Sequence, residues 1–326
     1  MTAPRSDVAI RLRSAAARWS PKFYPFLRRG YRWLVARPAG DDARNAAALA
    51  LRLTLITLLI GAPPATSLFT PIAAVAGLAV AGLITNRWYW LIVAGLFAFS
   101  PYVRPWLELD NHHWLQLYWF AAIAVTRFVP RRDDALQLAA RLLVGFAFLF
   151  AVVWKVIAPE FLNGGFFDLT FTADRRLGDV AAAIGWQDAD TATSTASAIG
   201  QWRTPGTQPE PIAVTVSESV ARITPRLAWM TVVIEAAVAV AFLAPLRRQW
   251  RYLRDGSMVV FVVATYPLAP VVGFGRLLVT MAAMQSNLLP RVRTALYVTV
   301  FAALSLLSER DVALDWLRAL FVVAVE

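Results

Sequence analysis

Long apolar runs follow one another along most of the chain, and short segments with arginine, proline or acidic residues separate them. A helix that crosses a bilayer needs about 20 mostly apolar residues, so runs near this length predict membrane-spanning helices. The predicted spans, several of them short, are residues 46–62, 68–85, 88–102, 113–129, 136–158, 227–246, 256–273, 276–290, 294–308 and 312–325. The pattern therefore predicts an all-α fold, a polytopic transmembrane helix bundle with eight to ten spans.

The composition excludes several classes of protein. Hydrophobic residues are 58% of the chain and charged residues only 16%, whereas soluble globular domains carry about 25% charged residues. The chain therefore has too little polar surface to cover itself in water. It contains no cysteine, which excludes disulfides, thiolate metal sites and cysteine nucleophiles.

Basic residues are distributed in a way that predicts a membrane orientation. The net charge is +11, but the arginines lie between apolar runs rather than along one helix face, so nucleic acid is not expected as a partner. Alternation of the spans puts the basic loops at 127–132, 247–254 and 291–293 on the same side as the basic segment 1–44. Positive charge marks the cytoplasmic side. The chain is thus predicted to be a multi-pass protein of the bacterial inner membrane with a cytoplasmic N-terminus.

The predicted bundle, residues 45–326, has one basic segment before it and one long polar segment within it. Segment 1–44 mixes aromatic residues with arginines, which suits either a stretch in the headgroup region or a plain cytoplasmic tail. Segment 159–226 is predicted to be a long extracytoplasmic loop with weak helical patches near 175–186 and 213–223. A long loop in a compact fold is often a lid or a binding loop, and a disordered linker is the alternative.

Lysine is scarce in this chain, which draws attention to Lys155. Of 32 basic residues, only Lys22 and Lys155 are lysines, and Lys155 lies inside an apolar run. An ionisable group in a spanning helix is a functional-site hypothesis by default, and a buried lysine can serve as a neutral amine base. The alternative is that Lys155 snorkels to the nearby interface. A turn is predicted just beyond it, at Asn163–Gly165.

Glu235 is the second ionisable group within a predicted span. It lies about nine residues from the extracytoplasmic end of that span, which is too deep for its side chain to reach water easily. A carboxylate at this depth is protonated or needs a partner, and Lys155 and Arg52 are the partners considered. A structural ion pair and a neutral, hydrogen-bonded acid are the simpler interpretations.

Both histidines of the chain lie in the segment Asp110–His113, at the predicted extracytoplasmic mouth of the fourth span. Successive helical residues point about 100° apart, so His112 and His113 do not both face one small site. Two histidines and one aspartate are too few ligands for a metal site, and no metal is expected. His112 is predicted to act as a base or hydrogen-bond donor; an interfacial loop anchored by Trp114 is the alternative.

The predicted topology places Asn111, His112, Lys155 and Glu235 in the extracytoplasmic half, which predicts a shared pocket there. One span opens with Asn111–Leu115, and the next closes with Trp154–Lys155 and is followed soon after by Phe161–Phe166. This pattern resembles the membrane domain of vitamin K-dependent γ-glutamyl carboxylase. It also resembles the bacterial horizontally transferred transmembrane (HTTM) domain proteins.

The resemblance implies specific roles for these residues. Lys155 would be the base that acts on a reduced quinone, and Asn111 and His112 would help to stabilise the reacting species. The span of Glu235 resembles the family's helix with a buried glutamate. Val153 and Trp154 depart from the pattern, because small residues usually precede the lysine. The chain also ends after the bundle, without a large lumenal domain, so carboxylation of peptides is not expected.

Two functions therefore compete. The first is a carboxylase-like or HTTM-type protein with an extracytoplasmic pocket for a quinone or another lipid-like ligand. Its catalytic residues would be Lys155, His112, Asn111 and Glu235, and its cofactor would be a reduced quinone. The second is non-enzymatic, a transporter or a scaffold subunit of an envelope complex. A pocket open to one side or to lipid favours the first, access from both sides favours a transporter, and a scaffold needs no pocket. Whether the protein is an enzyme is left open.

Overall fold

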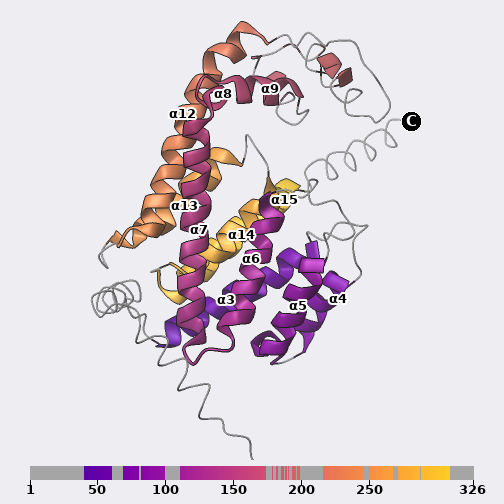
Figure 1. Ribbon diagram of the computed structural model, residues 1–326, viewed down its shortest axis with the longest axis vertical. Helices are drawn as coiled ribbons and strands as arrows, with labels where there is room; N and C mark the ends of the chain where they lie inside the picture. The colour runs from indigo at the N-terminus through magenta and orange to yellow at the C-terminus, as the bar shows by residue number, and fades with distance from the viewer. Residues whose placement is uncertain are drawn as a thin grey trace, which may run out of the picture.

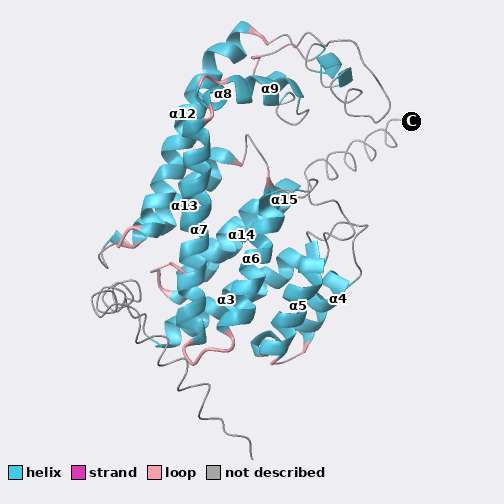
Figure 2. Cartoon of the chain, in the orientation of Figure 1, coloured by secondary structure: helices cyan, strands magenta, loops and turns pink. Residues whose placement is uncertain are grey.

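The computed structural model describes residues 40–60, 69–80, 82–99, 111–173, 216–245, 250–266, 271–286 and 288–308, together with short pieces between 178 and 198. Within these residues the chain is helical and contains no strand (Figure 2). The all-α prediction is therefore confirmed. The predicted span 312–325 and nearly all of segment 1–44 lie outside the described residues.

Each predicted span between 46 and 308 overlaps a described helix. The start of the predicted span 227–246 is displaced most clearly, because the helix there begins nine residues earlier, at Glu218. The helices are α3 (Gly40–Ile60), α4 (Phe69–Ala79), α5 (Arg87–Phe99), α6 (Asn111–Thr126), α7 (Arg132–Ile157), α8 (Pro159–Leu162), α9 (Gly165–Ala173), α12 (Glu218–Leu243), α13 (Tyr252–Thr265), α14 (Val272–Ala283) and α15 (Pro290–Ser308), and a 3-10 turn, η1 (Leu83–Thr85), follows α4.

Three of the described helices are long and apolar enough to cross a membrane: α3 from Asp42 to Ile60, α7 and α12. α5, α14 and most of α4 are shorter apolar helices. These lengths and compositions indicate a membrane protein. The number of crossings and the orientation stay predictions.

α7 contacts several helices of the described bundle rather than a single neighbour. It packs against α12, α6, α14 and α3. At about 1.5 Å per residue, the 16 residues of α6 span roughly 24 Å and the 26 residues of α7 roughly 39 Å. Figure 1 shows the consequence: α7 and α12 continue side by side beyond α6 and meet α8 and α9 at the far end.

Close contacts hold these helices in register. At Gly145 of α7, an added Cβ would lie 2.5 Å from the Leu243 side chain of α12, so only a glycine permits this approach. The fully buried Trp119 of α6 donates its indole N–H to the hydroxyl of Thr54 on α3 at 2.9 Å. Trp119 belongs to one continuous apolar core that includes residues of α3, α5, α6, α7 and α12 to α15.

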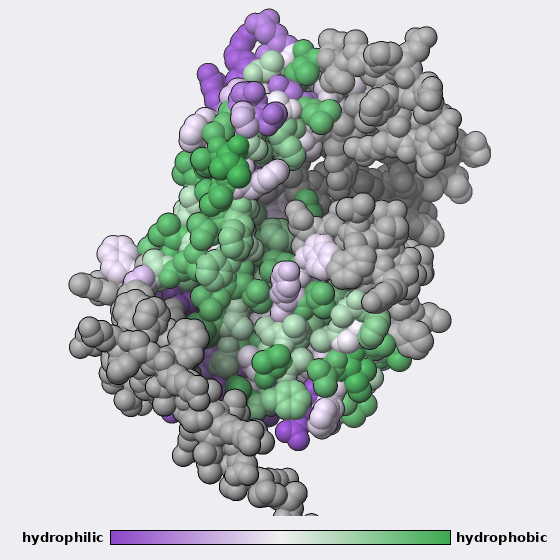
Figure 3. All heavy atoms as spheres, in the orientation of Figure 1, coloured by the Kyte–Doolittle hydropathy of each residue, from purple (hydrophilic) through white to green (hydrophobic). Residues whose placement is uncertain are grey.

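The outer faces of α7 and α12 are strongly apolar. Ile157 of α7 and Val233 and Val240 of α12 are each more than 60% exposed. Figure 3 shows hydrophobic atoms running continuously along this side of the molecule, with hydrophilic atoms gathered at its upper end. A soluble monomer rarely exposes so large an apolar surface, and this agrees with the membrane assignment.

Candidate functional site

Lys155 and Glu235 form an ion pair across the α7–α12 contact. The Lys155 ammonium lies 2.5 Å from both Oε1 and Oε2 of Glu235. The side chains are 17% and 9% exposed, respectively. Lys155 therefore does not extend freely to an interface, and the partner expected for Glu235 is present. Arg52, the other residue considered, has an exposed side chain on α3.

The end of α7 is set by local sequence. Pro159 disfavours helical geometry at the residue before it, and Ala158 is accordingly extended. Proline is well suited to the first turn of a helix, and α8 begins at Pro159. The turn brings the buried Phe161 back over the Lys155 ammonium, 5.3 Å from the ring centroid. A cation at this distance from an aromatic face is attracted to it, so Lys155 is held from two sides.

The start of α12 extends the other side of the site. Ser217 caps the helix by accepting a hydrogen bond from the backbone N–H of Val220 at 3.2 Å. Serine is among the preferred residues at this position. The helix thus begins within the segment 159–226, and its first turns overlap the helical patch predicted near 213–223. Asp168 of α9 accepts a hydrogen bond from Thr224 at 2.7 Å, which attaches α9 to this part of α12.

A cavity of about 860 Å³ lies beside the ion pair. Residues of α6, α7, α8, α9, α12, α13 and α14 line it, and most of them are apolar. The aromatic members are Trp114, Tyr118, Phe146, Phe150, Trp154, Phe161, Phe166, Phe167, Phe171 and Phe274. Pockets that take small organic ligands are usually about 300–1,000 Å³, mainly apolar, with a few polar groups. This cavity has that size and character.

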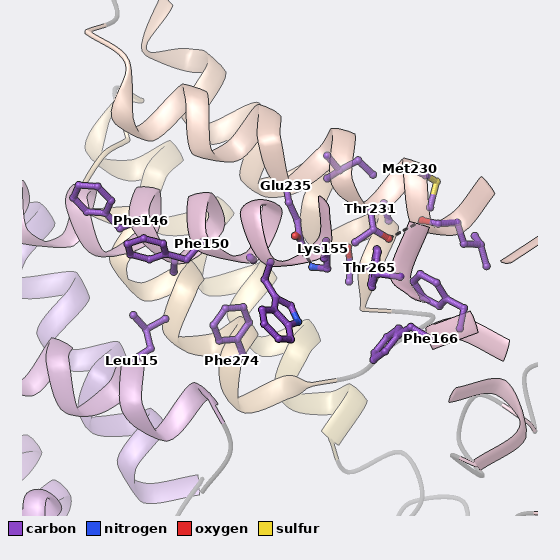
Figure 4. Close-up of a pocket in the computed structure, with 18 of the residues that line it drawn as sticks. Leu115, Phe146, Phe150, Lys155, Phe166, Met230, Thr231, Glu235, Thr265 and Phe274 are labelled. Atoms are coloured by element: carbon purple, nitrogen blue, oxygen red, sulfur yellow. Dashed lines mark hydrogen bonds and ion pairs between the residues drawn. The ribbon is translucent and has the colours of Figure 1, made fainter. Parts of the chain in front are cut away.

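Polar groups occur at few places on the cavity wall. Figure 4 shows Lys155 and Glu235 meeting at one wall, with Phe146 and Phe150 to one side and Phe166 to the other. Lys155 and Glu235 are the charged residues among those that line the cavity, and Thr231 and Thr265 are its threonines. The Thr231 hydroxyl donates to the carbonyl of Leu227 at 2.8 Å. The wall of this largely aromatic cavity therefore has one charged site, the Lys155–Glu235 pair, and a few neutral polar groups.

The two histidines lie away from the Lys155–Glu235 pair, at the start of α6. Asn111 is the first residue of α6. His112 lies against Gly273 of α14, where an added Cβ would be 3.1 Å from the imidazole. His113 points toward α5 and stacks on Phe97, with ring centroids 6.5 Å apart. His112 and His113 thus meet different helices, but their rings also contact each other, with centroids 4.2 Å apart and planes tilted by 32°.

The structure thus brings Lys155 and Glu235 together at the cavity wall, and the Asn111 side chain lies outside the described part of the chain. His112 is not among the residues that line the cavity, whereas Trp114 and Leu115 from the next turn positions of α6 are. The catalytic roles of Lys155, Glu235, His112 and Asn111 all stay predictions. In the described part of the chain, no three histidine or acidic side chains gather in a way that would hold a metal ion.

The aromatic cover supplied by α8 and α9 is the part of the site that sequence reasoning missed. Four phenylalanines at positions 161, 166, 167 and 171 all line the cavity. The sequence predicts only the beginning of a long extracytoplasmic loop for this segment. Its signal was present nonetheless, since four phenylalanines in eleven residues is an unusual density for a solvated loop.

Comparisons with protein-family models, with curated proteins and with solved structures each found no match to this chain. The resemblance to the carboxylase and HTTM proteins therefore stays a prediction. The function of the cavity has to be inferred from its own geometry.

Proposed function

We propose that the chain is a polytopic inner-membrane protein that binds a lipid-like ligand, such as a reduced quinone, in the aromatic cavity. Lys155 then faces the polar head of the ligand and acts on it as a base. The observation that carries this proposal is the cavity of about 860 Å³ with one ion pair in its wall. A ligand with an apolar body and one polar head is complementary to such a chamber.

The proposed orientation puts the cavity in the extracytoplasmic half of the membrane. The basic turn at 127–132 lies at one end of α7 and Lys155 at the other. Positive charge favours the cytoplasmic side for that turn, so the opposite end of α7 faces outward. The exposed apolar side of α7 and α12 would then contact lipid, and a lipid-like ligand would reach the cavity from the bilayer.

The ion pair supports a proton-transfer role because its ionised form and its neutral form, which differ by the position of one proton, both have a net charge of zero. Transfer of one proton from the Lys155 ammonium to the Glu235 carboxylate leaves a neutral amine and a neutral acid. The amine then removes a proton from a hydroxyl of the hydroquinone, which leaves a phenolate beside the new ammonium. No net charge enters the cavity in either step, which avoids the large cost of an isolated charge in an apolar site.

Ligand binding tests the proposal. The chain in lipid nanodiscs is titrated with a short-chain benzoquinol by calorimetry, with empty nanodiscs to subtract partitioning into lipid. Ala151 lines the cavity, and Ala151→Trp should fill it and weaken binding by at least roughly tenfold, equivalent to about 1.4 kcal/mol. Ala302 is exposed on α15, so Ala302→Trp is the matched control and should bind like the wild type. Equal heats from empty and protein-loaded nanodiscs would refute the proposal.

Labelling distinguishes a binding site of this kind from a transport path. The chain has no cysteine, so a single cysteine introduced at Thr231 reports on the cavity alone. In inside-out and right-side-out vesicles, a membrane-impermeant maleimide is expected to reach it from the outer side at most. If the maleimide labelled this cysteine from both sides, and a transported solute slowed the labelling from each side, the transporter alternative would be favoured.

A further inference from the structure

A second, basic cleft lies at the other end of α7. It has a volume of about 410 Å³ and lies between the start of α3 and the turn that joins α6 to α7. Its charged lining residues are Arg44, Arg127, Arg131, Arg132, Asp133 and Asp134. Four arginines against two aspartates leave a net charge of +2 in a small space. At about 1.5 Å per residue, the 23 positions from Arg132 to Lys155 separate this cleft from the ion pair by roughly 35 Å.

Arg127 distinguishes this cleft from an ordinary cluster of exposed charges, because its guanidinium is buried. Its side chain is only 2% exposed, and Nη1 donates to the Asp133 carboxylate at 3.2 Å. Its Nε and Nη2 are buried and make no hydrogen bond within the described part of the chain. A guanidinium carries five N–H donors, and leaving buried donors without an acceptor is unfavourable. The cleft therefore presents a buried cation with unused donors.

We propose that this cleft binds a phosphate group through Arg127, with Arg44, Arg131 and Arg132 at its entrance. Arginine binds phosphate in a bidentate way, and a tetrahedral phosphate can accept from several guanidinium groups at once. Arg44, Arg131 and Arg132 are exposed, so they are free to close around such an anion. Asp133 is already engaged by Arg127 and does not cancel the positive charge of the other three arginines.

Helix α7 adds to the preference for an anion. Arg131 is its N-cap residue and makes no side-chain hydrogen bond to the first turn. The N-terminus of a helix carries a partial positive charge and free N–H groups that favour phosphate. This feature supplements the buried donors of Arg127.

The phosphate belongs either to an anionic lipid headgroup or to a free phosphate ion, and the same donors recognise both. In the orientation proposed above, the cleft faces the cytoplasmic leaflet, where basic pockets between helices contact anionic headgroups. The binding chemistry itself does not depend on that orientation or on the quinone proposal.

Native mass spectrometry of the full chain in a neutral detergent tests this site. Phosphatidylglycerol is titrated against phosphatidylcholine, and inorganic phosphate is added in a separate series. An arginine at an anionic membrane surface contributes about fivefold in affinity. Arg131→Gln with Arg132→Gln is therefore expected to weaken phosphatidylglycerol binding roughly 25-fold. The exposed pair Arg222 and Arg226 lies on α12, so Arg222→Gln with Arg226→Gln is the control of equal charge and should change binding by less than about twofold.

Arg127→Lys is the sharper variant, because it retains the charge and a donor for Asp133 but loses the guanidinium fork. It should weaken binding while the unfolding temperature stays near that of the wild type. A loss of phosphatidylglycerol binding that inorganic phosphate does not imitate identifies a lipid site. Competition by inorganic phosphate, with the same sensitivity to Arg127→Lys, identifies a site for the free ion. Equal effects of the cleft and control variants, or no preference for either probe in the wild type, would overturn the proposal.

Discussion

Lys155→Met is expected to lower the free energy of unfolding by about 3–5 kcal/mol, because it leaves the Glu235 carboxylate buried without its partner. The two groups lie 2.5 Å apart and both are largely buried. Breaking a buried ion pair from one side is far more damaging than removing the pair. Thermal and chemical unfolding in detergent, followed by circular dichroism, measures the change.

A double-mutant cycle supplies the control for this prediction. Glu235→Leu alone should also destabilise the fold, whereas Lys155→Met with Glu235→Leu should recover most of the loss, since neither charge remains. The exposed pair Glu218 and Arg222 on α12 has the same residue classes at 2.6 Å. Removing that pair should cost less than about 1 kcal/mol. If the two single variants at the buried pair were additive, Lys155 and Glu235 would not be coupled, and Lys155 would lose its assigned place in the cavity wall.

Gly164→Val is expected to destabilise the fold by about 2–5 kcal/mol and to weaken ligand binding in the aromatic cavity. Gly164 has φ +93°, a conformation that a β-branched residue rarely adopts. An added Cβ would also lie 2.8 Å from the backbone nitrogen of Pro225, so the substitution crowds the contact between this turn and α12. The turn positions α8 and α9, whose phenylalanines cover the cavity.

Gly82 separates the two contributions to this effect. It has φ +84° but no atom within 4 Å of an added Cβ. Gly82→Val should therefore show only the backbone strain, about 1–3 kcal/mol, and should leave quinol binding unchanged. Unfolding temperatures and calorimetric titrations of both variants provide the comparison. Unaltered binding in Gly164→Val would mean that α8 and α9 do not form part of the ligand site.

Most of the helical framework follows from the sequence because hydrophobic runs are local signals. The apolar runs between residues 46 and 308 all correspond to helical structure, and three are long enough to cross a membrane. The turn at Asn163–Gly165 was also predictable, since glycine tolerates the positive φ found at Gly164. The pairing of Lys155 with Glu235 was foreseeable for a related reason. A deep carboxylate in an apolar helix needs a cation, and few cations lie at that depth.

Other features depend on how whole helices are placed. Topology put His112 and Lys155 on the same side, but α7 is about 15 Å longer than α6 at 1.5 Å per residue. His112 consequently meets Gly273, while Lys155 lies beyond the end of α6, beneath α8. No property of the sequence near either residue records this difference. It arises from the register in which α6 and α7 pack.

The sequence by itself determined the helical class, the positions of the apolar helices other than α8 and α9, and the need of Glu235 for a partner. Each of these depends on residues close together in the chain or on the cost of a charge among apolar groups. Only the tertiary structure decided that α8 and α9 fold back to cover an aromatic cavity. It also decided that Arg127 lies buried with unused donors, although its sequence context is that of a basic loop at a membrane surface. Cavities and buried donors result from the distances between helices, and those distances are set by contacts such as Gly145 with Leu243, whose partners lie far apart in the chain.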